Sequence, residues 1–286
     1  MKKLLPVALA AAGSAAVAGG ALAAWGYSEL TNFQLREVSL PGPKCTILHI
    51  SDLHMLPGQR KKIDFVNSLA ELNPDLVINT GDNLSDPKGL PDAIQALTPL
   101  LQFPGAFCFG TNDYFGPRLV NPFGYLLGRK RKVSEKENDW RSLRSVLVEH
   151  GWHDVNNARA AFKLGGINVS IGGVDDPHHD PDEYPGPPHE GSELKLALLH
   201  APEPRVLEQF AADGYQLALS GHTHGGQICL PGGKTIVTNC GIDRERAKGL
   251  HRFGDMYMHV SEGLGTAKFA PVRLWCPPAA TLIHMG

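Results

Sequence analysis

Short apolar runs alternate with segments of helical periodicity along most of the chain. Residues 60–73 carry apolar side chains at the spacing of a helix face and stop at Pro74, and further helices are predicted over residues 90–101, 140–150 and 205–212. Buried strands are predicted at "CTILHISD", "DLVINTGD", "AFCFG", "INVSIGGVDD", "LKLALLHAP" and "YQLALSGH". After Gln227 only short strands follow, at "QICL", "TIVTN", "MYMHVS", "VRLWC" and "ATLIHM".

This alternation predicts an α/β domain built from packed layers. A linker and a first strand over residues 28–44 end at Pro41, Gly42 and Pro43, and the main domain is expected to cover residues 45–286. The stretch "PHHDPDEYPGPPHEG" at 177–191 holds too much proline and glycine for regular structure, so we expect a surface loop there. The pattern gives no indication of the oligomeric state.

The first 27 residues form a separate hydrophobic segment. Lys2 and Lys3 precede a stretch from Leu4 to Ser28 that carries no charge, and a bilayer span takes about 20 apolar residues. The segment predicts a plasma-membrane anchor or, because "ALA" at 21–23 resembles a cleavage site, an export signal that is removed. Either interpretation places the main domain outside the cytoplasm, and the aromatic residues Trp25 and Tyr27 favour the uncleaved anchor.

Charge and cysteine content exclude several classes of protein. The formal net charge is -2, from 27 basic and 29 acidic residues, so no nucleic-acid partner is expected. The basic stretch "GRKRK" at 128–132 is a local exception, which fits either a solvated loop or a patch for anionic head groups. Five cysteines without CxxC spacing argue against a disulfide framework and against a cysteine-rich zinc site.

Five of the predicted strands end in residues that can bind a metal ion. These side chains belong to Asp52, His54, Asp82, Asn112, Asp113, His200, His222 and His224. In α/β sheets ligands bind at the carboxyl ends of the strands, so the five ends are expected to converge. The set mixes oxygen and imidazole donors without a thiolate, which suits two divalent ions of Mn, Fe or Zn.

The order of these motifs resembles the calcineurin-like metallophosphoesterase family. The family signature is DxH, GD, GNH followed by an acid, a lone His and GHxH, and this chain has "DLH", "GD", "TND", "LHAP" and "GHTH" in that order from residue 52 to residue 224. The resemblance implies a four-layer α/β/β/α sandwich with a dinuclear centre. It also implies that Asp52, His54 and His224 hold one metal, that Asn112, His200 and His222 hold the other, and that Asp82 bridges them.

The motif around Asn112 departs from the family pattern. Asn112 and Asp113 are the candidate catalytic pair, but the family carries a proton-donating His after the Asn, where this chain has Asp113. Nearby cations lower the pKa of a carboxylate, and an ionised Asp113 cannot donate a proton. Three explanations stay open. Another histidine, such as His178 or His179, replaces the missing proton donor, the substrate has a good leaving group, or turnover is slow. A further alternative gives Asp113 a capping or ligand-orienting role.

The resemblance implies a metal-dependent phosphoesterase that hydrolyses a phosphodiester, phosphomonoester or pyrophosphate bond by attack of a metal-bridging hydroxide. The substrate is a phosphate ester, and the predicted anchor extends the hypothesis to lipid-linked phosphates. The alternative is a non-catalytic or weakly active metal-binding surface protein of the same fold. Zinc hydrolases of two other folds fit poorly, because "HTH" comes late in the chain and "HTHGGQ" lacks a following Asp-His pair. The substrate and the metal identity stay open at this stage.

Overall fold

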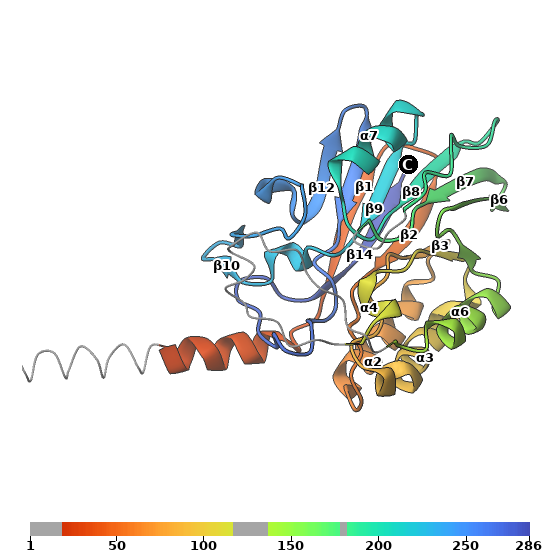
Figure 1. The fold of residues 1–286 in the computed structure, drawn as a ribbon. Helices are drawn as coiled ribbons and strands as arrows, with labels where there is room; N and C mark the ends of the chain where they lie inside the picture. Colours follow the sequence, from red (N-terminus) through yellow and green to blue (C-terminus); the bar gives the residue numbers. More distant parts are fainter. Residues whose placement is uncertain (1–18, 117–136, 178–181) are drawn as a thin grey trace, which may run out of the picture.

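The computed structural model describes residues 19–116, 137–177 and 182–286, and its body is built on two six-stranded sheets (Figure 1). The order in the first sheet is β1 (Gln34–Leu40), β14 (Ala279–Met285), β2 (Cys45–Ile50), β3 (Leu76–Asn79), β4 (Gly105–Phe107) and β5 (His153–Asp154). The order in the second is β12 (Gly249–Phe253), β13 (Met256–Val260), β9 (Leu217–Ser220), β8 (Leu194–Leu198), β7 (Ile167–Gly173) and β6 (Ala158–Leu164). A two-stranded hairpin of β10 (Cys229–Leu230) and β11 (Lys234–Thr235) lies outside both sheets.

Helices cover the outer faces of the two sheets. The α-helices are α2 (Arg60–Ser68), α3 (Leu90–Leu97), α4 (Thr111–Tyr114), α6 (Trp140–Glu149) and α7 (Pro204–Ala212). Short 3₁₀ turns are η1 (Leu69–Leu72), η2 (Pro87–Gly89), η3 (Thr98–Gln102), η4 (His224–Gly226) and η5 (Arg244–Arg246). One hydrophobic cluster joins α2, α3 and α6 to the first sheet, and another joins α7 to the second.

A third hydrophobic cluster fills the space between the sheets. It brings Ile47 and Ile78 of the first sheet together with Leu196 and Leu219 of the second, and all four side chains are buried. The layers therefore run helices, sheet, sheet, helix, and the predicted mixed α/β class is confirmed. The central strands are apolar on both faces because each face packs on another layer.

Parallel pairing aligns the strand ends that matter for the site. Strands β2, β3 and β4 are parallel neighbours in the first sheet, and β7, β8 and β9 are parallel neighbours in the second. Parallel strands point their carboxyl ends to the same edge of a sheet. The C-terminal strand β14 pairs antiparallel with β2 and parallel with β1, so the end of the chain lies inside the first sheet.

Several predicted boundaries are corrected by the structure. The helices predicted over 60–73 and 90–101 end at Ser68 and Leu97 and continue as 3₁₀ turns. Strands β6 and β12 were missed, because their exposed positions break the apolar run expected of a strand. "VRLWC" forms no strand, and Leu274 within it makes an isolated bridge to Ile228.

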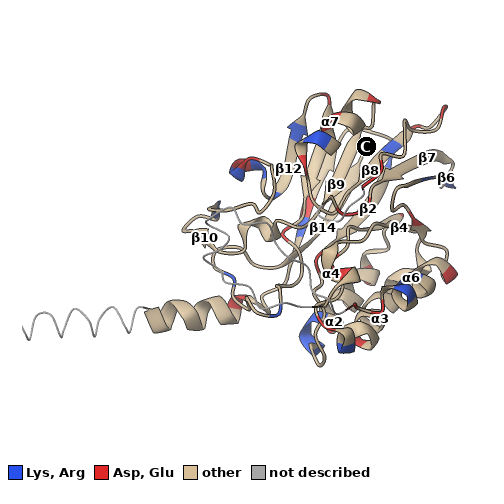
Figure 2. Ribbon diagram, in the orientation of Figure 1, with Lys and Arg blue, Asp and Glu red and all other residues tan. Residues whose placement is uncertain are grey.

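The N-terminal region enters the described residues as a helix over 19–29, which projects from the body (Figure 1). Among the described residues no helix has both the length and the apolar character needed to cross a bilayer, so the predicted membrane span is not supported by them. Residues 1–18, "GRKRK" at 128–132 and the candidates His178 and His179 lie outside the described residues. Basic and acidic residues are interspersed along the ribbon in Figure 2, in keeping with the near-neutral net charge.

Candidate metal centre

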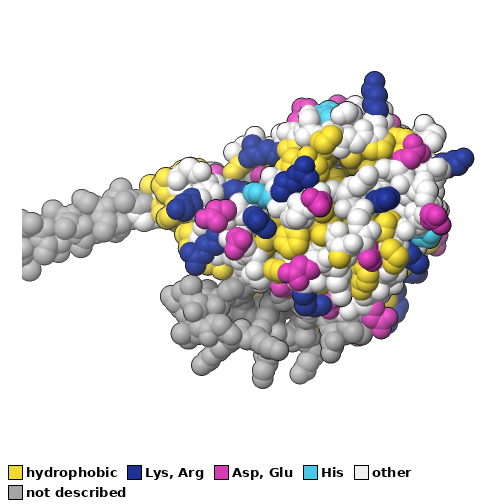
Figure 3. All heavy atoms as spheres, turned by 90° about the horizontal axis from the view of Figure 1, so that it is seen from above, with side chains coloured by type: hydrophobic (Ala, Val, Ile, Leu, Met, Phe, Trp, Pro, Cys, Tyr) yellow, Lys and Arg dark blue, Asp and Glu magenta, His cyan; other side chains and the backbone are white. Residues whose placement is uncertain are grey.

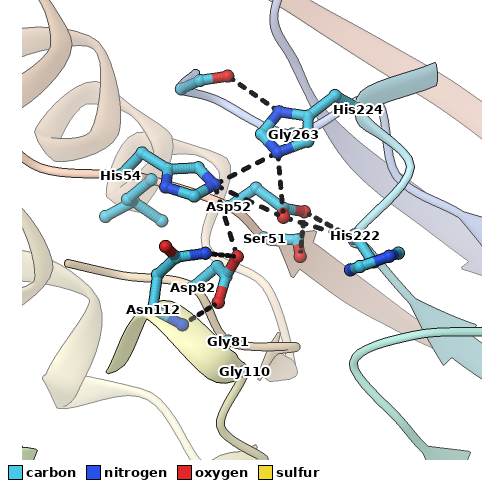
Figure 4. Close-up of polar contacts among 12 residues, drawn as sticks. Ser51, Asp52, His54, Gly81, Asp82, Gly110, Asn112, His222, His224 and Gly263 are labelled. Carbon is cyan, nitrogen blue, oxygen red and sulfur yellow. Dashed lines mark hydrogen bonds and ion pairs between the residues drawn. The ribbon is translucent and has the colours of Figure 1, made fainter. Parts of the chain in front are cut away.

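Side chains from five strand ends of the two sheets lie together, and Figure 4 shows those of Asp52, His54, Asp82, Asn112, His222 and His224. Asp52, His54 and His224 form one group, whose ligand atoms lie within 4.8 Å of one another. The Nε2 atoms of His54 and His224 face each other at 3.1 Å, and His224 Nε2 lies 3.5 Å from Asp52 Oδ1. All three residues are buried, so their polar atoms face one another rather than bulk water.

A second group shares Asp52 and adds Asp82 and His200, again with ligand atoms within 4.8 Å. Asp82 Oδ2 lies 3.4 Å from His54 Nε2 and 3.3 Å from His200 Nε2. A single carboxylate oxygen therefore stands between an imidazole of each group. This is the position that a bridging ligand between two cations requires.

Each of the three imidazoles is oriented by a hydrogen bond at its other ring nitrogen. His54 Nδ1 bonds to the Ser85 hydroxyl at 2.7 Å, His200 Nδ1 to the Thr80 carbonyl at 2.7 Å and His224 Nδ1 to the Gly265 carbonyl at 3.0 Å. A carbonyl partner accepts the Nδ1 proton, so that in the neutral ring the lone pair lies on Nε2. The Nε2 atoms of all three rings point into the centre.

Left-handed backbone geometry is concentrated at the same residues. Asp52, His54, Asp82, His222 and His224 have φ between 43° and 68°. Non-glycine residues rarely adopt this region, and such strain persists only where the surrounding structure enforces it. The strand-to-loop bends that bring two ligands from one strand end into the centre therefore carry a conformational cost.

Gly110 allows the first sheet to approach His200. A Cβ atom at Gly110 would lie 2.7 Å from two carbons of the His200 ring and would also collide with the Asp82 carboxylate. Only glycine leaves room for this approach. Immediately afterwards the chain turns into α4, whose Asn112 donates from its backbone N–H to Asp82 Oδ1 at 2.8 Å and from its side-chain amide to Asp82 Oδ2 at 2.6 Å.

Burial and mutual charge shift the pKa values within the centre. Burial raises the pKa of the Asp52 carboxyl to about 6. Burial also opposes ionisation of Asp82 and His200, but their opposite charges dominate: the pKa of Asp82 is held well below its usual range and that of His200 well above it. At His224, burial and the neighbouring His54 and Arg273 lower the pKa well below its usual value.

These donors fit divalent cations. His200 Nε2 is buried and makes no hydrogen bond, although it faces the Asp82 carboxylate. His54 and His224 direct their nitrogens at each other, an arrangement that an ion between ring nitrogens and carboxylates would satisfy. Imidazole and carboxylate donors without a thiolate suit Mn, Fe or Zn, in agreement with the donor set expected from the sequence.

Comparison with known proteins agrees with this geometry. The family model of calcineurin-like phosphoesterases matches residues 45–226, which span every strand end described above. The chain belongs to the calcineurin-like phosphoesterase family. The uncharacterized protein YpbG of Bacillus subtilis (strain 168) is 29% identical over 96% of this chain and 96% of its own length.

Two further relatives carry names that describe an activity. The uncharacterized metallophosphoesterase YkoQ of Bacillus subtilis (strain 168) is 27% identical, over 78% of this chain and 77% of its own. The phosphodiesterase YaeI of Escherichia coli (strain K12) is 30% identical, over 91% of this chain and 89% of its own. Membership of the family indicates a hydrolase that acts on phosphoester bonds, and the members use a dinuclear metal centre.

The positions of the predicted ligands in this phosphoesterase can now be stated. Asp52, His54, Asp82, His200 and His224 lie together in the two groups, and the Asn112 amide lies against Asp82. His222 is more peripheral: its ring centroid lies 5.3 Å from that of His200, and its Nε2 contacts the Asn239 carbonyl at 3.3 Å. Its backbone N–H donates to the Asp52 carboxylate. The division of the ligands between two metals stays a prediction.

Asp113 holds the backbone of the centre. Its carboxylate accepts the N–H groups of Asp82 at 2.7 Å, Asn83 at 2.8 Å and Gly110 at 3.0 Å, and the side chain is fully buried. Both oxygens are thus occupied by backbone donors from two loops. This geometry supports the capping and orienting role that we set beside the catalytic one.

Sequence reasoning missed Asp176. This buried carboxylate accepts the backbone N–H of Thr111 at 2.7 Å and its hydroxyl at 2.5 Å, and its charge contributes to the raised pKa of His200. Asp176 follows β7, the parallel neighbour of β8. The signal was present, because the apolar run "INVSIGGV" breaks into "DD" in the same way as the five strand ends that were recognised.

Arg273 is a second residue that sequence reasoning missed, and unlike Asp176 it has no signal in the sequence. Its guanidinium is fully buried and donates to the carbonyls of Glu262 at 2.8 Å and Gly265 at 2.7 Å. Gly265 is also the partner of His224 Nδ1, so Arg273 fixes the loop that orients this imidazole. Arginine suits such a position because its planar fork offers five donors.

Proposed function

We propose that this protein is a metal-dependent phosphoesterase that cleaves a phosphodiester or pyrophosphate bond whose leaving group departs without needing a strong acid. The observation that carries the proposal is the Asp82 carboxylate, one oxygen of which lies within 3.4 Å of imidazoles from both ligand groups. Asp52, His54 and His224 would hold one divalent ion, and Asn112, His200 and His222 the other. When bound, two such ions supply Lewis-acid stabilisation of phosphoryl oxygens and lower the pKa of water.

The protein's own groups would prepare the site for a phosphate. Two carboxylates, Asp52 and Asp82, only partly offset two divalent charges, so the loaded centre keeps a positive charge that attracts an anionic substrate. Asn112 adds a neutral amide beside Asp82 and no further negative charge. The backbone N–H groups of Asn112 and His222 donate to the carboxylates of Asp82 and Asp52 and hold them in place.

The arrangement around Asp113 supports the choice of bond. Because three backbone N–H groups occupy its carboxylate, Asp113 faces the backbone rather than the space where a leaving oxygen would sit. Such a residue does not protonate a leaving group, which favours activated esters and anhydrides over alkyl monoesters. The relative named a phosphodiesterase is in keeping with this proposal.

The activity test compares three substrates with Mn²⁺ present: a nitrophenyl diester, a nitrophenyl monoester and a nucleotide-linked pyrophosphate. We expect the diester or the pyrophosphate to be cleaved fastest, and we expect Asp82→Asn and His200→Ala to abolish the reaction. The matched control Asp64→Asn removes an exposed carboxylate from α2 and should leave activity unchanged. A purified protein that binds metal but cleaves none of the three would favour the non-catalytic alternative.

We further propose that the catalytic domain is attached to a membrane and acts on its extracytoplasmic side. Among the described residues, all exposed large hydrophobic side chains except Val148 lie in three segments. They are Leu22, Trp25, Tyr27, Ile228, Leu230, Ile236 and Phe269. Figure 3 shows hydrophobic side chains on the N-terminal helix next to the body, and others distributed over the same face. Exposed aromatic and aliphatic side chains of this kind mark interaction surfaces.

Contacts join these segments into one region. The Trp25 ring meets the Trp275 ring edge-on at 4.7 Å, and the Gly26 carbonyl accepts the N–H of Arg273 at 3.1 Å. Ile228 bridges to Leu274 in the same loop. This region adjoins the loop of His224, so attachment would place the metal centre close to lipid-linked phosphates.

Membrane attachment is tested with the full chain expressed in cells. Fractionation should recover the protein with membranes, and external protease should digest it in intact cells. Replacement of Leu230 and Phe269 by Ser should weaken the binding of the purified protein to phospholipid vesicles. The matched control Val148→Ser lies on α6 and should not. Digestion only after lysis would refute the extracytoplasmic placement.

A further inference from the structure

The thiols of Cys229 and Cys276 lie against the same backbone carbonyl behind the metal centre. Cys229 Sγ donates to the Gly225 carbonyl at 3.3 Å, and Cys276 Sγ lies 3.5 Å from the same oxygen and 3.4 Å from the His224 carbonyl. Both sulfur atoms therefore lie within 3.5 Å of one oxygen atom. Strand β10 contributes one and the segment before β14 the other, so only the folded chain brings them together.

A lysine stands beside both sulfur atoms. Lys248 Nζ lies 3.6 Å from Cys229 Sγ and 3.7 Å from Cys276 Sγ. Cys276 and Lys248 also line an open cavity of about 390 Å³, together with Arg36, Glu262 and Trp275. A small reagent in this cavity would reach Lys248 and the Cys276 sulfur.

The pair differs from the other cysteines in its surroundings. Burial raises the pKa of the Cys45 thiol to about 11 and that of Cys240 to about 12. The adjacent Cys276 thiol, assisted by the Lys248 ammonium, instead lowers the pKa of the Cys229 thiol to about 6, whereas the Cys229 thiol and burial raise the pKa of Cys276. A thiolate next to a second thiol is the arrangement found in reactive cysteine pairs.

We propose that Cys229 and Cys276 are a redox modification site, at which a peroxide or another two-electron oxidant forms a reversible disulfide. With hydrogen peroxide, one sulfur attacks the peroxide, the O–O bond breaks, and a sulfenic acid and one water form. The second thiol then attacks the sulfenic sulfur, the S–S bond forms and a second water leaves. Two thiols thereby lose two electrons and two protons, and one peroxide becomes two waters.

The disulfide would act on the loop of a metal ligand. A disulfide sulfur carries no proton, so the bonds from Cys276 to the His224 carbonyl and from Cys229 to the Gly225 carbonyl would be lost. Arg273 and Thr235 still donate to these two carbonyls, so the loop loosens without losing every contact. Changes to groups that orient metal ligands cost on the order of tenfold in metal affinity, and we expect about that effect here.

The decisive experiment maps thiols in the purified full-length protein and requires no activity. After brief treatment with hydrogen peroxide, the protein is unfolded, alkylated and digested without reduction. We expect one cross-linked peptide pair containing Cys229 and Cys276, two fewer alkylated thiols, and full reversal by a dithiol reductant. Five thiols still alkylated after peroxide, or a cross-link between another pair, would overturn the proposal.

Variants separate the pair from general oxidation. Cys240→Ser is the matched control and should keep the cross-link, whereas Cys229→Ser should lose it. Lys248→Met should slow cross-linking several-fold at neutral pH. The Mn²⁺ affinity of the wild-type protein is measured by titration after oxidation and again after the same sample has been reduced. An affinity that is equal in the two states would refute the coupling to His224. Because the peptide map uses the wild-type chain, misfolding of a variant leaves that result intact.

Discussion

The Asp113 carboxylate accepts the backbone N–H of Asp82 at 2.7 Å, so the residue that departs from the family pattern holds the residue expected to bridge two metals. It also accepts Gly110 N–H, which ties the end of β4 to the loop after β3. This carboxylate therefore sets the distance between two neighbouring strand ends. Its role can be separated from that of a proton donor by measurement.

Replacement of Asp113 by Asn should weaken the centre regardless of the leaving group. An amide presents one oxygen and one NH₂, so at least one of the three backbone donors loses its acceptor at a cost of about 1–3 kcal/mol. We expect kcat to fall by the same factor for nitrophenyl and alkyl esters, with less bound metal. The measurement is kcat for both substrates beside metal content. A loss confined to alkyl esters would identify Asp113 as the acid.

Asp82→Asn should remove metal from both positions, because this residue contacts imidazoles of both groups. Bound metal, measured by elemental analysis, should fall below about one equivalent per chain, and the thermal midpoint should no longer respond to added Mn²⁺. Asp64→Asn serves as the exposed control on α2. If Asp82→Asn still held two equivalents, the bridging role would be wrong.

Asp176→Asn should weaken metal binding on the His200 side. The buried carboxylate anchors Thr111 and adds negative charge near His200. Loss of such a supporting group typically costs about 10–100-fold in metal affinity or activity. Thr111→Val removes the hydroxyl bond alone and should produce a smaller loss in the same direction, while Thr111→Ser should retain binding. Equal Mn²⁺ affinity in Asp176→Asn and wild type would contradict this role.

Buried Lys62 should make stability depend on pH. Its ammonium donates to the Leu53 carbonyl, between two ligands of the centre, and burial lowers its pKa from 10.5 to about 7. Between these values the unfolded chain binds one proton more than the folded chain, so the free energy of unfolding rises with pH. The expected slope is up to about 1.4 kcal/mol per pH unit.

Urea unfolding between about pH 7 and pH 9 measures this slope. Lys62→Met should flatten it because the titrating group is gone, whereas Lys61→Met, the exposed neighbour on α2, should retain the wild-type slope. A pH dependence that is identical in Lys62→Met and wild type would show that the ammonium of Lys62 keeps its ordinary pKa in the folded protein.

The local pattern of apolar and polar residues was sufficient to predict much of the fold. Runs such as "CTILHI" are long enough and apolar enough to be strands in any layered α/β protein, and β2, β3, β8 and β9 lie where they were predicted. Exposed and half-buried residues alternate along most of β6, and β12 has no fully buried residue, so both strands depend on edge pairing with β7 and β13 rather than on an apolar run. The short helix α4 has only four residues and no periodicity to read.

The ligand types were likewise readable along the chain, but their grouping was not. The order DxH, GD, ND, H and HxH indicated which residues could bind metal, because strand ends and ligand chemistry are local properties. Sequence could not show that His222 lies to one side while Asp52 contributes to both groups. That depends on which sheet each strand joins and on the left-handed bends at five of the ligands.

By itself, then, the sequence determined the layered class, the strand ends and the donor set, since apolar periodicity and side-chain chemistry act over a few residues. The tertiary structure decided what distant residues do to one another. It turned Asp113 toward three backbone amides, placed Asp176 beside Thr111, and brought Cys229 and Cys276 together under Lys248. Such contacts join residues that are far apart in the sequence, so they depend on how the strands and loops pack and no short spacing along the chain encodes them.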